Sequence, residues 1–240
     1  MRAAVFPWRE GNRFELLIDG PQFFPRMLVA IARAQHQVEL ELYLVEAGTC
    51  AEAMVQALVQ AAQRGVRVRC LFDDYGSLAF TQALRRSLTE AGVELRFYNR
   101  LKWRQGFLNL YRDHRKLLLV DQALAVVGGT GVTDEFWKPE DNSCDWHEVM
   151  VAIAGPMVSD WQQLFDRQWS ANLYRGAWKP GADFGLPRLP RLPDTGEGMG
   201  RVAYADARQH RDILHSLIRA LSSGQRRIWL ATPYLSLIHI

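Results

Sequence analysis

The sequence has little of what marks a secreted or membrane-spanning protein. Its three cysteines, Cys50, Cys70 and Cys144, are odd in number and widely spaced, so they form neither a disulfide framework nor a cysteine metal site. This usage favours a reducing, cytoplasmic setting. No window approaches the ~20 continuous apolar residues of a membrane-spanning helix, and the apolar part of Met1–Arg13 is too short for a signal peptide. Any action on a membrane is therefore expected from its surface.

A strong charge of either sign is also missing. The formal net charge is +3, and 23% charged with 48% hydrophobic residues is ordinary for a globular protein, which excludes wholesale disorder. The mild positive charge suits a phospholipid surface, a phosphate ester or a nucleic acid without choosing among them. A chain of 240 residues can hold one large domain, or one domain and part of another.

Helix-like and strand-like patterns alternate through the first part of the chain. Apolar spacing predicts helices over Pro25–Gln35, Ala51–Arg64 and Phe80–Ala91, the last two ended by Gly65 and Gly92. Strands are predicted between and after them, at Val38–Val45, Val66–Phe72 and Val93–Tyr98. Charged and apolar residues alternate in the first of these strands, as in a strand with one buried face. Such alternation of strands and helices implies parallel pairing with helical crossovers, hence an α/β fold.

The pattern changes after Trp178. Residues 179–200 are rich in proline and glycine, lack periodicity, and are predicted to be a linker or long surface loop. Beyond them Ile213–Leu221 resembles Met27–Gln35, and a polar turn and a strand, Ile228–Tyr234, follow. We therefore predict an internal duplication, with a first domain over 1–178 and the start of a second repeat over 201–234.

The last six residues, 235–240, do not continue any pattern. Their sequence, LSLIHI, is the translation of the start of a transposon end used as a sequencing adapter. We expect these residues to be an adapter artefact, so they are left out of the fold and site predictions.

One segment combines residues suited to phosphodiester chemistry. In Tyr111–Thr133, His114, Lys116 and Asp121 form the pattern His-x-Lys-x-x-x-x-Asp, with an apolar run on each side of Asp121. On a strand His114 and Lys116 would share one face. A neutral imidazole can attack phosphorus, and an ammonium can offset charge on the phosphate oxygens. Asp121 begins a turn and is expected to tether a neighbouring strand or turn. Gly128 and Gly129 follow, and their lack of side chains lets a phosphate or another backbone approach.

This segment resembles the HKD motif of the phospholipase D superfamily. The cardiolipin synthase branch is indicated by WREGN at Trp8–Asn12, AAQRGV at Ala61–Val66 and DDYGS at Asp73–Ser77. The likeness runs from about Trp8 to Trp169 and more faintly over Arg211–Tyr234. It implies a phospholipase D-like fold with a mixed or parallel sheet flanked by helices, as the first half of a pseudo-two-fold duplicated architecture. It also implies one active site shared by two halves, without a metal or other cofactor, in which one histidine is the nucleophile and the other protonates the leaving alcohol.

The resemblance assigns roles to individual residues. His114, Lys116 and Asp121 match the motif, and Gly128 and Gly129 match its glycine turn, with Thr130 beside them as a phosphate-binding candidate. In Asp145–Pro156, Glu148 falls where the family has an acidic residue that hydrogen-bonds the catalytic histidine. Four further residues bear on the site. Gly131 stands where many members have an asparagine, so Thr130 or Thr133 would have to replace its contact to phosphate. Glu41 could also reach the pocket, and His147, next to Glu148, is left unassigned.

Three functions remain open. The leading one is phosphatidyl transfer between phosphatidylglycerol-type lipids through a phosphohistidine, which makes cardiolipin. This chain would act at the cytoplasmic face of the bacterial inner membrane, without nucleic acid as a partner. The basic and aromatic segment Arg100–Arg115 would lie on anionic lipid, although its composition also suits a nucleic-acid backbone or an ordinary packed connection. The same chemistry with water as acceptor would give a phospholipase or nuclease, and a non-catalytic membrane-binding half-domain is the third. Since the sequence holds one HKD motif, we expect little activity unless a second half in cis, or a second copy in a homodimer, completes the site.

Overall fold

The computed structural model describes residues 6–102, 106, 109–171, 192–204 and 211–230. The elements are, in chain order, β1 (Arg9–Ile18), α1 (Gly20–Arg33), β2 (Gln37–Leu42), α2 (Thr49–Gln63), β3 (Arg67–Asp73), α3 (Gln82–Glu90), β4 (Glu94–Tyr98), β5 (Leu117–Val120), β6 (Leu124–Gly128), β7 (Val149–Ala154), α4 (Met157–Ala171), β8 (Gly198–Gly200) and α5 (Arg211–Ser223). The predicted adapter segment, 235–240, and residues 179–191 of the predicted linker lie outside the described residues. No helix among those described is long and apolar enough to span a membrane.

The strands form one sheet of mixed direction, in the order β4-β3-β2-β5-β6-β7-β1-β8. Strands β2, β3 and β4 are parallel and are joined by α2 and α3, which confirms the predicted helical crossovers. The remaining pairs are antiparallel. A short turn between β5 and β6 allows only antiparallel pairing, because a parallel neighbour would need a long crossover. The α/β class and the flanked mixed sheet are thus confirmed.

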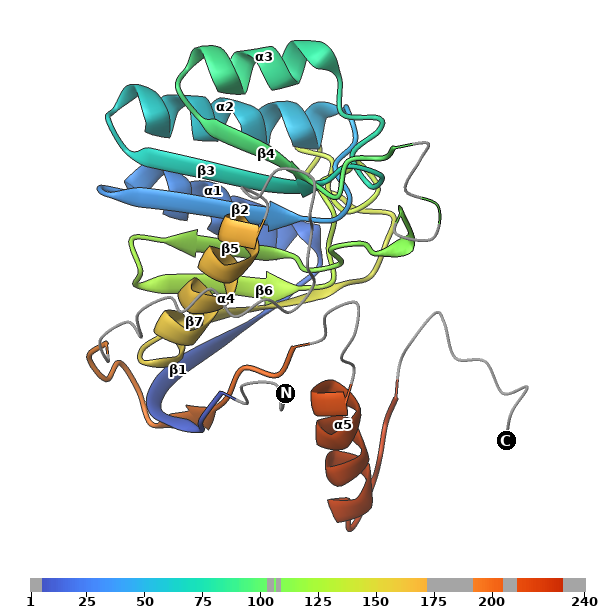
Figure 1. The fold of residues 1–240 in the computed structure, drawn as a ribbon. Coiled ribbons are helices and arrows are strands. Elements are labelled where there is room, and N and C mark those ends of the chain that lie inside the picture. The colour runs from blue at the N-terminus through green and yellow to red at the C-terminus, as the bar shows by residue number, and fades with distance from the viewer. Residues whose placement is uncertain (1–5, 103–105, 107–108, 172–191, 205–210, 231–240) are drawn as a thin grey trace.

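Helices cover both faces of the sheet. Helices α1, α2 and α3 lie on one face and α4 lies on the other (Figure 1). In β5, Leu118 and Val120 belong to the core under α1–α3, whereas Leu117 and Leu119 belong to the core under α4. Because β5 lies at the centre of the sheet and is buried on both faces, its sequence, LLLV, is a continuous apolar run.

Helix boundaries were predicted best where a glycine ends the helix. Gly65 and Gly92 follow α2 and α3 with φ of 88° and 87°, the left-handed conformation that only glycine adopts without strain. Helix α1, in contrast, begins at Gly20, before the predicted start at Pro25. Phe23 and Phe24 are fully buried and extend the apolar face of the helix toward its N-terminus, so Pro25 lies inside the helix.

The prediction of one buried face for β2 was wrong. Val38, Leu40 and Leu42 are buried on the α1–α3 side, but Glu39 and Glu41 are also buried, with 1% and 0% exposed. Helix α4 covers the charged side of the strand, where each glutamate meets an arginine, Arg69 or Arg115. Sequence alternation alone does not reveal that the polar face is covered by a helix more than 100 residues away.

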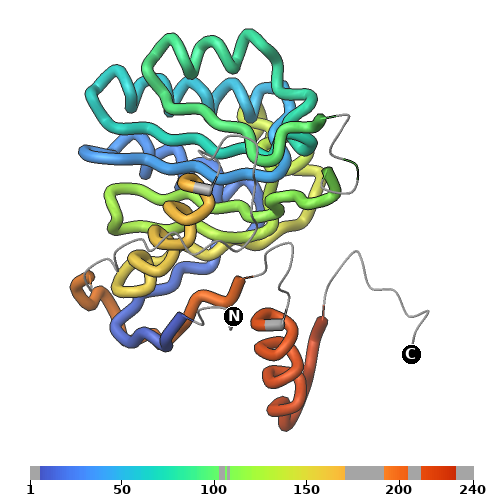
Figure 2. Tube along the Cα trace, viewed as in Figure 1, coloured from blue at the N-terminus to red at the C-terminus, as the bar shows by residue number. Residues whose placement is uncertain are grey.

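The end of the predicted linker is part of the sheet. Residues 198–200 form β8, which pairs with β1 at the edge of the sheet. In Figure 2 this orange segment runs beside the blue start of the chain. Val202 is fully buried in the core under α4. Residues 198–202 thus contribute to the same sheet and core as β1–β7, although the first domain was predicted to end at 178.

The segment predicted to begin a second repeat is only partly described. The predicted helix Ile213–Leu221 is confirmed within α5. Of the predicted strand Ile228–Tyr234, residues 228–230 are exposed and not in a strand, and the rest lies outside the described residues.

Candidate active site

His114 and Lys116 lie side by side just before β5. Strand β5 begins at Leu117, so the two residues precede the strand instead of sharing its face as predicted. The Lys116 side chain turns back along the chain, placing Nζ 2.8 Å from His114 Nδ1 and donating a hydrogen bond to the His114 carbonyl oxygen at 2.8 Å. The predicted imidazole–ammonium pair is therefore formed, through a folded-back lysine.

An aromatic ring completes this pair. The ring of Tyr43, just after β2, lies 4.5 Å from the His114 ring, centroid to centroid. Lys116 Nζ lies 5.3 Å from the Tyr43 centroid, within cation–π range. Sequence analysis did not single out Tyr43, because its contact with His114 depends on the pairing of β2 with β5.

Burial and charge tune both basic groups. Partial burial of the imidazole, reinforced by the Lys116 charge, lowers the pKa of His114 below its usual value. Burial also lowers the pKa of Lys116 to about 8, although the carboxylates of Asp113 and Glu148 oppose this change. Near pH 7 His114 is therefore mainly neutral, as a nucleophile at phosphorus must be, while Lys116 is mainly charged.

A buried ion pair supports the segment from the α4 side. Arg115 Nη2 lies 2.7 Å from Glu41 Oε1, and Arg115 Nε lies 3.5 Å from Asp113 Oδ1. Burial raises the pKa of Glu41, and Arg115 counteracts that rise. Asp113 also accepts from the Gln168 side chain on α4 at 3.2 Å. Glu41, which was predicted to reach the pocket, instead holds Arg115, the residue between His114 and Lys116.

Asp121 lies at the opposite end of β5 from the His114–Lys116 pair. Its carboxylate accepts from the backbone amides of Gln35, His36 and Gln37 at 2.8–2.9 Å, where α1 leads into β2. These bonds lower the pKa of Asp121. This agrees with the tethering role expected for Asp121 and gives it no contact with the imidazole.

Glu148 lies at the glycine turn and does not bond His114. Among the described residues, Glu148 Oε1 accepts from the amide of Val149 at 2.8 Å, and Lys116 takes the place beside the imidazole predicted for Glu148. A Cβ at Gly129 would come within 2.5 Å of Glu148 Oε2, so the missing side chain makes room for this carboxylate. Glu148 contributes negative charge near Lys116.

The other phosphate-binding candidates line the same turn. A Cβ at Gly128 would lie 2.7 Å from the Val149 carbonyl oxygen, so this glycine admits the neighbouring strand. Thr130 is buried and its hydroxyl donates to the Gly131 carbonyl oxygen at 2.9 Å, so in this structure it is not free to contact phosphate. Thr133 is buried, and its Oγ1 has no hydrogen-bond partner among the described residues.

His147, left unassigned by the sequence, points away from this chemistry. Its side chain is 74% exposed, and Nδ1 lies 2.7 Å from Asp19 Oδ1.

Known proteins share both the sequence and the fold. The sequence profile of the family "Cardiolipin synthase, PLD-like domain" matches residues 27–169. Cardiolipin synthase A of Pseudomonas putida W619 is 31% identical over 95% of this chain and 46% of its own length. Cardiolipin synthase B of Salmonella typhi is 32% identical over 95% of this chain and 54% of its own length. The chain thus spans about half the length of these curated relatives.

Solved structures support the fold. Nuc of Salmonella typhimurium, a phospholipase D family member, has a TM-score of 0.51 at 18% identity, over 66% of this chain and 95% of Nuc. NucT of Helicobacter pylori gives the same TM-score at 12% identity, over 66% of this chain and 96% of NucT. At these identities the likeness concerns the fold alone. The family profile covers more than half of the chain, and on that ground the chain belongs to the cardiolipin synthase family of phospholipase D-like domains.

Proposed function

We propose that this chain carries one half of the active site of a phosphatidyltransferase that makes cardiolipin from phosphatidylglycerol-type lipids. The observation that carries the proposal is the His114–Lys116 pair, with Nζ 2.8 Å from Nδ1, in a chain about 30% identical to cardiolipin synthases over 95% of its length. A nearly neutral imidazole beside a fixed ammonium suits attack on a phosphodiester, since the ammonium offsets charge on the non-bridging oxygens.

The proposed reaction has two displacements. One histidine nitrogen forms a bond to the phosphorus of a donor phosphatidylglycerol, while the bond from phosphorus to the glycerol oxygen breaks and the second histidine gives that oxygen a proton. A hydroxyl of the acceptor lipid then attacks the phosphohistidine, the phosphorus–nitrogen bond breaks, and the second histidine takes the hydroxyl proton. His114 supplies one of these two roles, and a second half or a second copy of the chain supplies the other.

We also propose that the chain acts from the cytoplasmic surface of the bacterial inner membrane. Exposed apolar side chains, Tyr75, Leu78, Leu101 and Leu110, lie on the connections that follow β3 and β4 and lead to His114. Arg100 and Lys102 are exposed on either side of Leu101. Aromatic and aliphatic groups next to cations suit the interface of an anionic bilayer, and the free cysteines Cys50, Cys70 and Cys144 suit a reducing compartment.

Product analysis tests the function. The chain is incubated with mixed micelles of radiolabelled phosphatidylglycerol, and lipids are separated by thin-layer chromatography; a parallel sample receives supercoiled DNA. Cardiolipin with release of glycerol supports the transferase. Phosphatidic acid alone, or nicked DNA, would establish water as the acceptor and overturn the transfer proposal. Binding without any product at all protein concentrations would exclude a site completed by a second copy of this chain, and would leave a second half in cis or the non-catalytic half-domain.

Vesicle sedimentation tests the membrane surface. We expect binding to vesicles of phosphatidylglycerol and phosphatidylcholine to fall about tenfold for Leu110→Glu, because Leu110 is 74% exposed on the proposed face. The matched control is Leu16→Glu on β1, which is 61% exposed and distant in the sheet order from β3 and β4. Equal loss with both variants would contradict this surface.

A further inference from the structure

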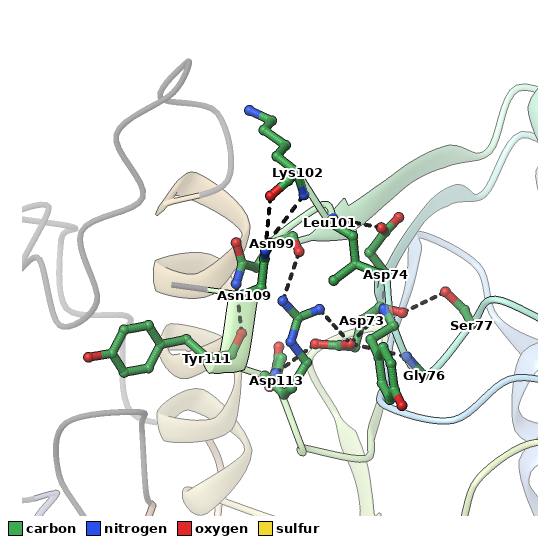
Figure 3. Close-up of polar contacts among 12 residues, drawn as sticks. Asp73, Asp74, Gly76, Ser77, Asn99, Leu101, Lys102, Asn109, Tyr111 and Asp113 are labelled. Atoms are coloured by element: carbon green, nitrogen blue, oxygen red, sulfur yellow. Dashed lines mark hydrogen bonds and ion pairs between the residues drawn. The ribbon is translucent and has the colours of Figure 1, made fainter. Parts of the chain in front are cut away.

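Asp73, at the end of β3, has a fully buried carboxylate whose contacts converge on the segment before His114. Its Oδ2 accepts from the backbone amide of Asp113 at 2.9 Å, and its Oδ1 lies 3.3 Å from Arg112 Nη1. The same oxygen accepts from the amides of Tyr75 and Gly76 at 2.9 and 3.2 Å. Figure 3 shows Asp73 between the turn at Gly76 and the backbone at Asp113.

All four partners of the Asp73 carboxylate are donors. An ionised carboxylate accepts on both oxygens, whereas an asparagine has one acceptor oxygen and a donor NH2 group. Burial raises the pKa of Asp73, but the hydrogen bonds and Arg112 oppose that rise and favour the charged form. Asn at this position would have to turn an N–H toward another N–H, which makes the site specific for a carboxylate.

The bond to Asp113 matters because the next residue is His114. Residues 111–116 belong to no helix or strand, so no ladder of backbone bonds fixes them. Side chains fix them instead: Arg112 Nη2 donates to the Asn99 carbonyl oxygen at 3.1 Å, and Asn99 Nδ2 donates to the Tyr111 carbonyl oxygen at 2.8 Å. Asp73 joins this group through Arg112 and through the Asp113 amide, whose bond to Asp73 can be followed in Figure 3.

Asp73 also supports the imidazole from its other side. Its bond to the Gly76 amide fixes the turn beneath Tyr43, where a Cβ on Gly76 would come within 2.0 Å of the Tyr43 carbonyl oxygen. The Val45 amide donates to the Gly76 carbonyl oxygen at 3.1 Å, which ties the same two segments together. The Tyr43 ring then packs on His114.

We propose that Asp73 is a positioning residue for His114: it fixes the backbone before His114 through the Asp113 amide and fixes the Tyr43 ring through the Gly76 turn. This inference rests on the proposed function, in which His114 is the reacting group. Asp73 itself touches neither substrate nor the reacting atoms.

The test is the Asp73→Asn variant, followed by NMR of protein labelled at histidine Cε1, with the His114 signal assigned by its loss in His114→Gln. In wild type, burial and Lys116 lower the pKa of His114, while Asp113 opposes them. We expect this pKa to rise by about half a unit or more in Asp73→Asn, because the imidazole loses its fixed packing. Signals of the other histidines should not move. If the chain turns over phosphatidylglycerol, kcat should fall about 10–100-fold with little change in KM.

The matched control is Asp160→Asn. Asp160 is equally a buried carboxylate, paired with Arg9 at 2.8 Å, and it lies on α4 away from His114. A purely structural loss would lower stability in both variants and leave the His114 titration unchanged. A folded Asp73→Asn protein with the wild-type His114 titration would overturn the proposal. Absence of turnover in wild type would count against the proposed function, while the NMR result would still decide the role of Asp73.

If Asp73→Asn does not fold, hydrogen exchange and a second variant test the proposal instead. In wild type the Asp113 amide should exchange with solvent at least about 100-fold more slowly than an unprotected amide, because it donates to a buried carboxylate. In Arg112→Gln, which removes one donor from Asp73, the His114 pKa should move in the same direction by a smaller amount. Rapid exchange at Asp113, or an unmoved His114 in Arg112→Gln, would overturn the proposal.

Discussion

At the scale of single residues, the site holds an ammonium where burial disfavours its charge. Lys116 is 7% exposed, and its pKa is lowered to about 8. The contacts of Nζ to the His114 carbonyl oxygen and to the Tyr43 ring only partly replace water. A charge kept in such a place at a cost to stability is typical of a functional group.

Lys116→Met should therefore stabilise the protein while removing activity. The folded-state pKa of Lys116 lies below its unfolded value, so the unfolded chain binds the proton more tightly and the charge destabilises the fold at neutral pH. One pKa unit corresponds to about 1.4 kcal/mol, so we expect a gain on the order of 1–2 kcal/mol near pH 7 after the lost hydrogen bonds are counted. This gain should shrink as pH rises from about 8 toward the unfolded pKa, about 10.4.

Urea unfolding at several pH values measures this effect. The matched control is Lys102→Met, because Lys102 is exposed and its loss should change the free energy of unfolding by less than about 0.5 kcal/mol. If Lys116→Met lowered the free energy of unfolding at pH 7, the Lys116 ammonium would stabilise the fold, which would contradict this account.

The two basic residues of the site could be predicted from the sequence, but their contacts could not. His114 and Lys116 followed from the spacing of the motif, and they do lie together. The partner predicted for the imidazole, Glu148, lies instead at Gly129, since Lys116 folds back over its own backbone. Tyr43 and Asp73 reach the site through tertiary packing from β2 and β3, which no local pattern encodes.

At the scale of elements, the two glycines at the end of β6 have different close neighbours. Gly128 is the last residue of β6, and Gly129 follows it. A Cβ on Gly128 would meet backbone atoms of the neighbouring strand, the Val149 carbonyl oxygen and Met150 Cα, at 2.7 and 2.9 Å. The three atoms nearest to a Cβ on Gly129 would all belong to the carboxylate of Glu148, the far end of a flexible side chain. Gly128 is therefore required by the sheet and Gly129 by the site.

The pair Gly128→Ala and Gly129→Ala tests this distinction. We expect Gly128→Ala to lower the free energy of unfolding by about 1–3 kcal/mol, because β6 and β7 must separate. Gly129→Ala should cost less than about 1 kcal/mol and instead displace Glu148, which would lower the Lys116 pKa further because a favourable carboxylate moves away. Thermal unfolding and Lys116 titration by NMR measure both effects. Equal stability of the two variants would contradict the account.

Elements with their own periodicity were predicted, and elements defined by distant partners were not. Gly65 and Gly92 follow the ends of α2 and α3 and stop these helices as expected. The burial of Glu39 and Glu41 on β2 depended on α4, and β8 depended on pairing with β1, at the other end of the chain. Those contacts come from the topology and leave no local trace in the sequence.

At the scale of the whole molecule, the chain presents one His-x-Lys pair in a family whose curated members match it over about half of their length. A phosphoryl transfer through histidine needs a group that protonates the leaving alcohol, and His147, the histidine nearest in sequence, is turned to Asp19 on the surface. We therefore propose that the second histidine comes from another half or from another copy of the chain. The mixed sheet order itself was only partly predictable, because alternating elements indicate parallel pairing and do not reveal where the direction reverses.

Turnover of this chain should depend on association. We expect specific activity to rise with protein concentration and to follow the dimer fraction measured by analytical ultracentrifugation, since each copy contributes His114. Addition of excess His114→Ala chain should reduce activity, because mixed dimers carry one histidine. Robust turnover by a proven monomer would refute the shared site.

The most direct test of the central claim compares His114→Ala with His147→Ala under conditions in which wild type converts phosphatidylglycerol. Both variants remove an imidazole, but only His114 contacts Lys116 and Tyr43, while His147 is 74% exposed and paired with Asp19. With folding verified by circular dichroism, we predict loss of at least about 1,000-fold in turnover for His114→Ala and no more than about a twofold change for His147→Ala. A folded His114→Ala protein that keeps wild-type turnover would contradict the account.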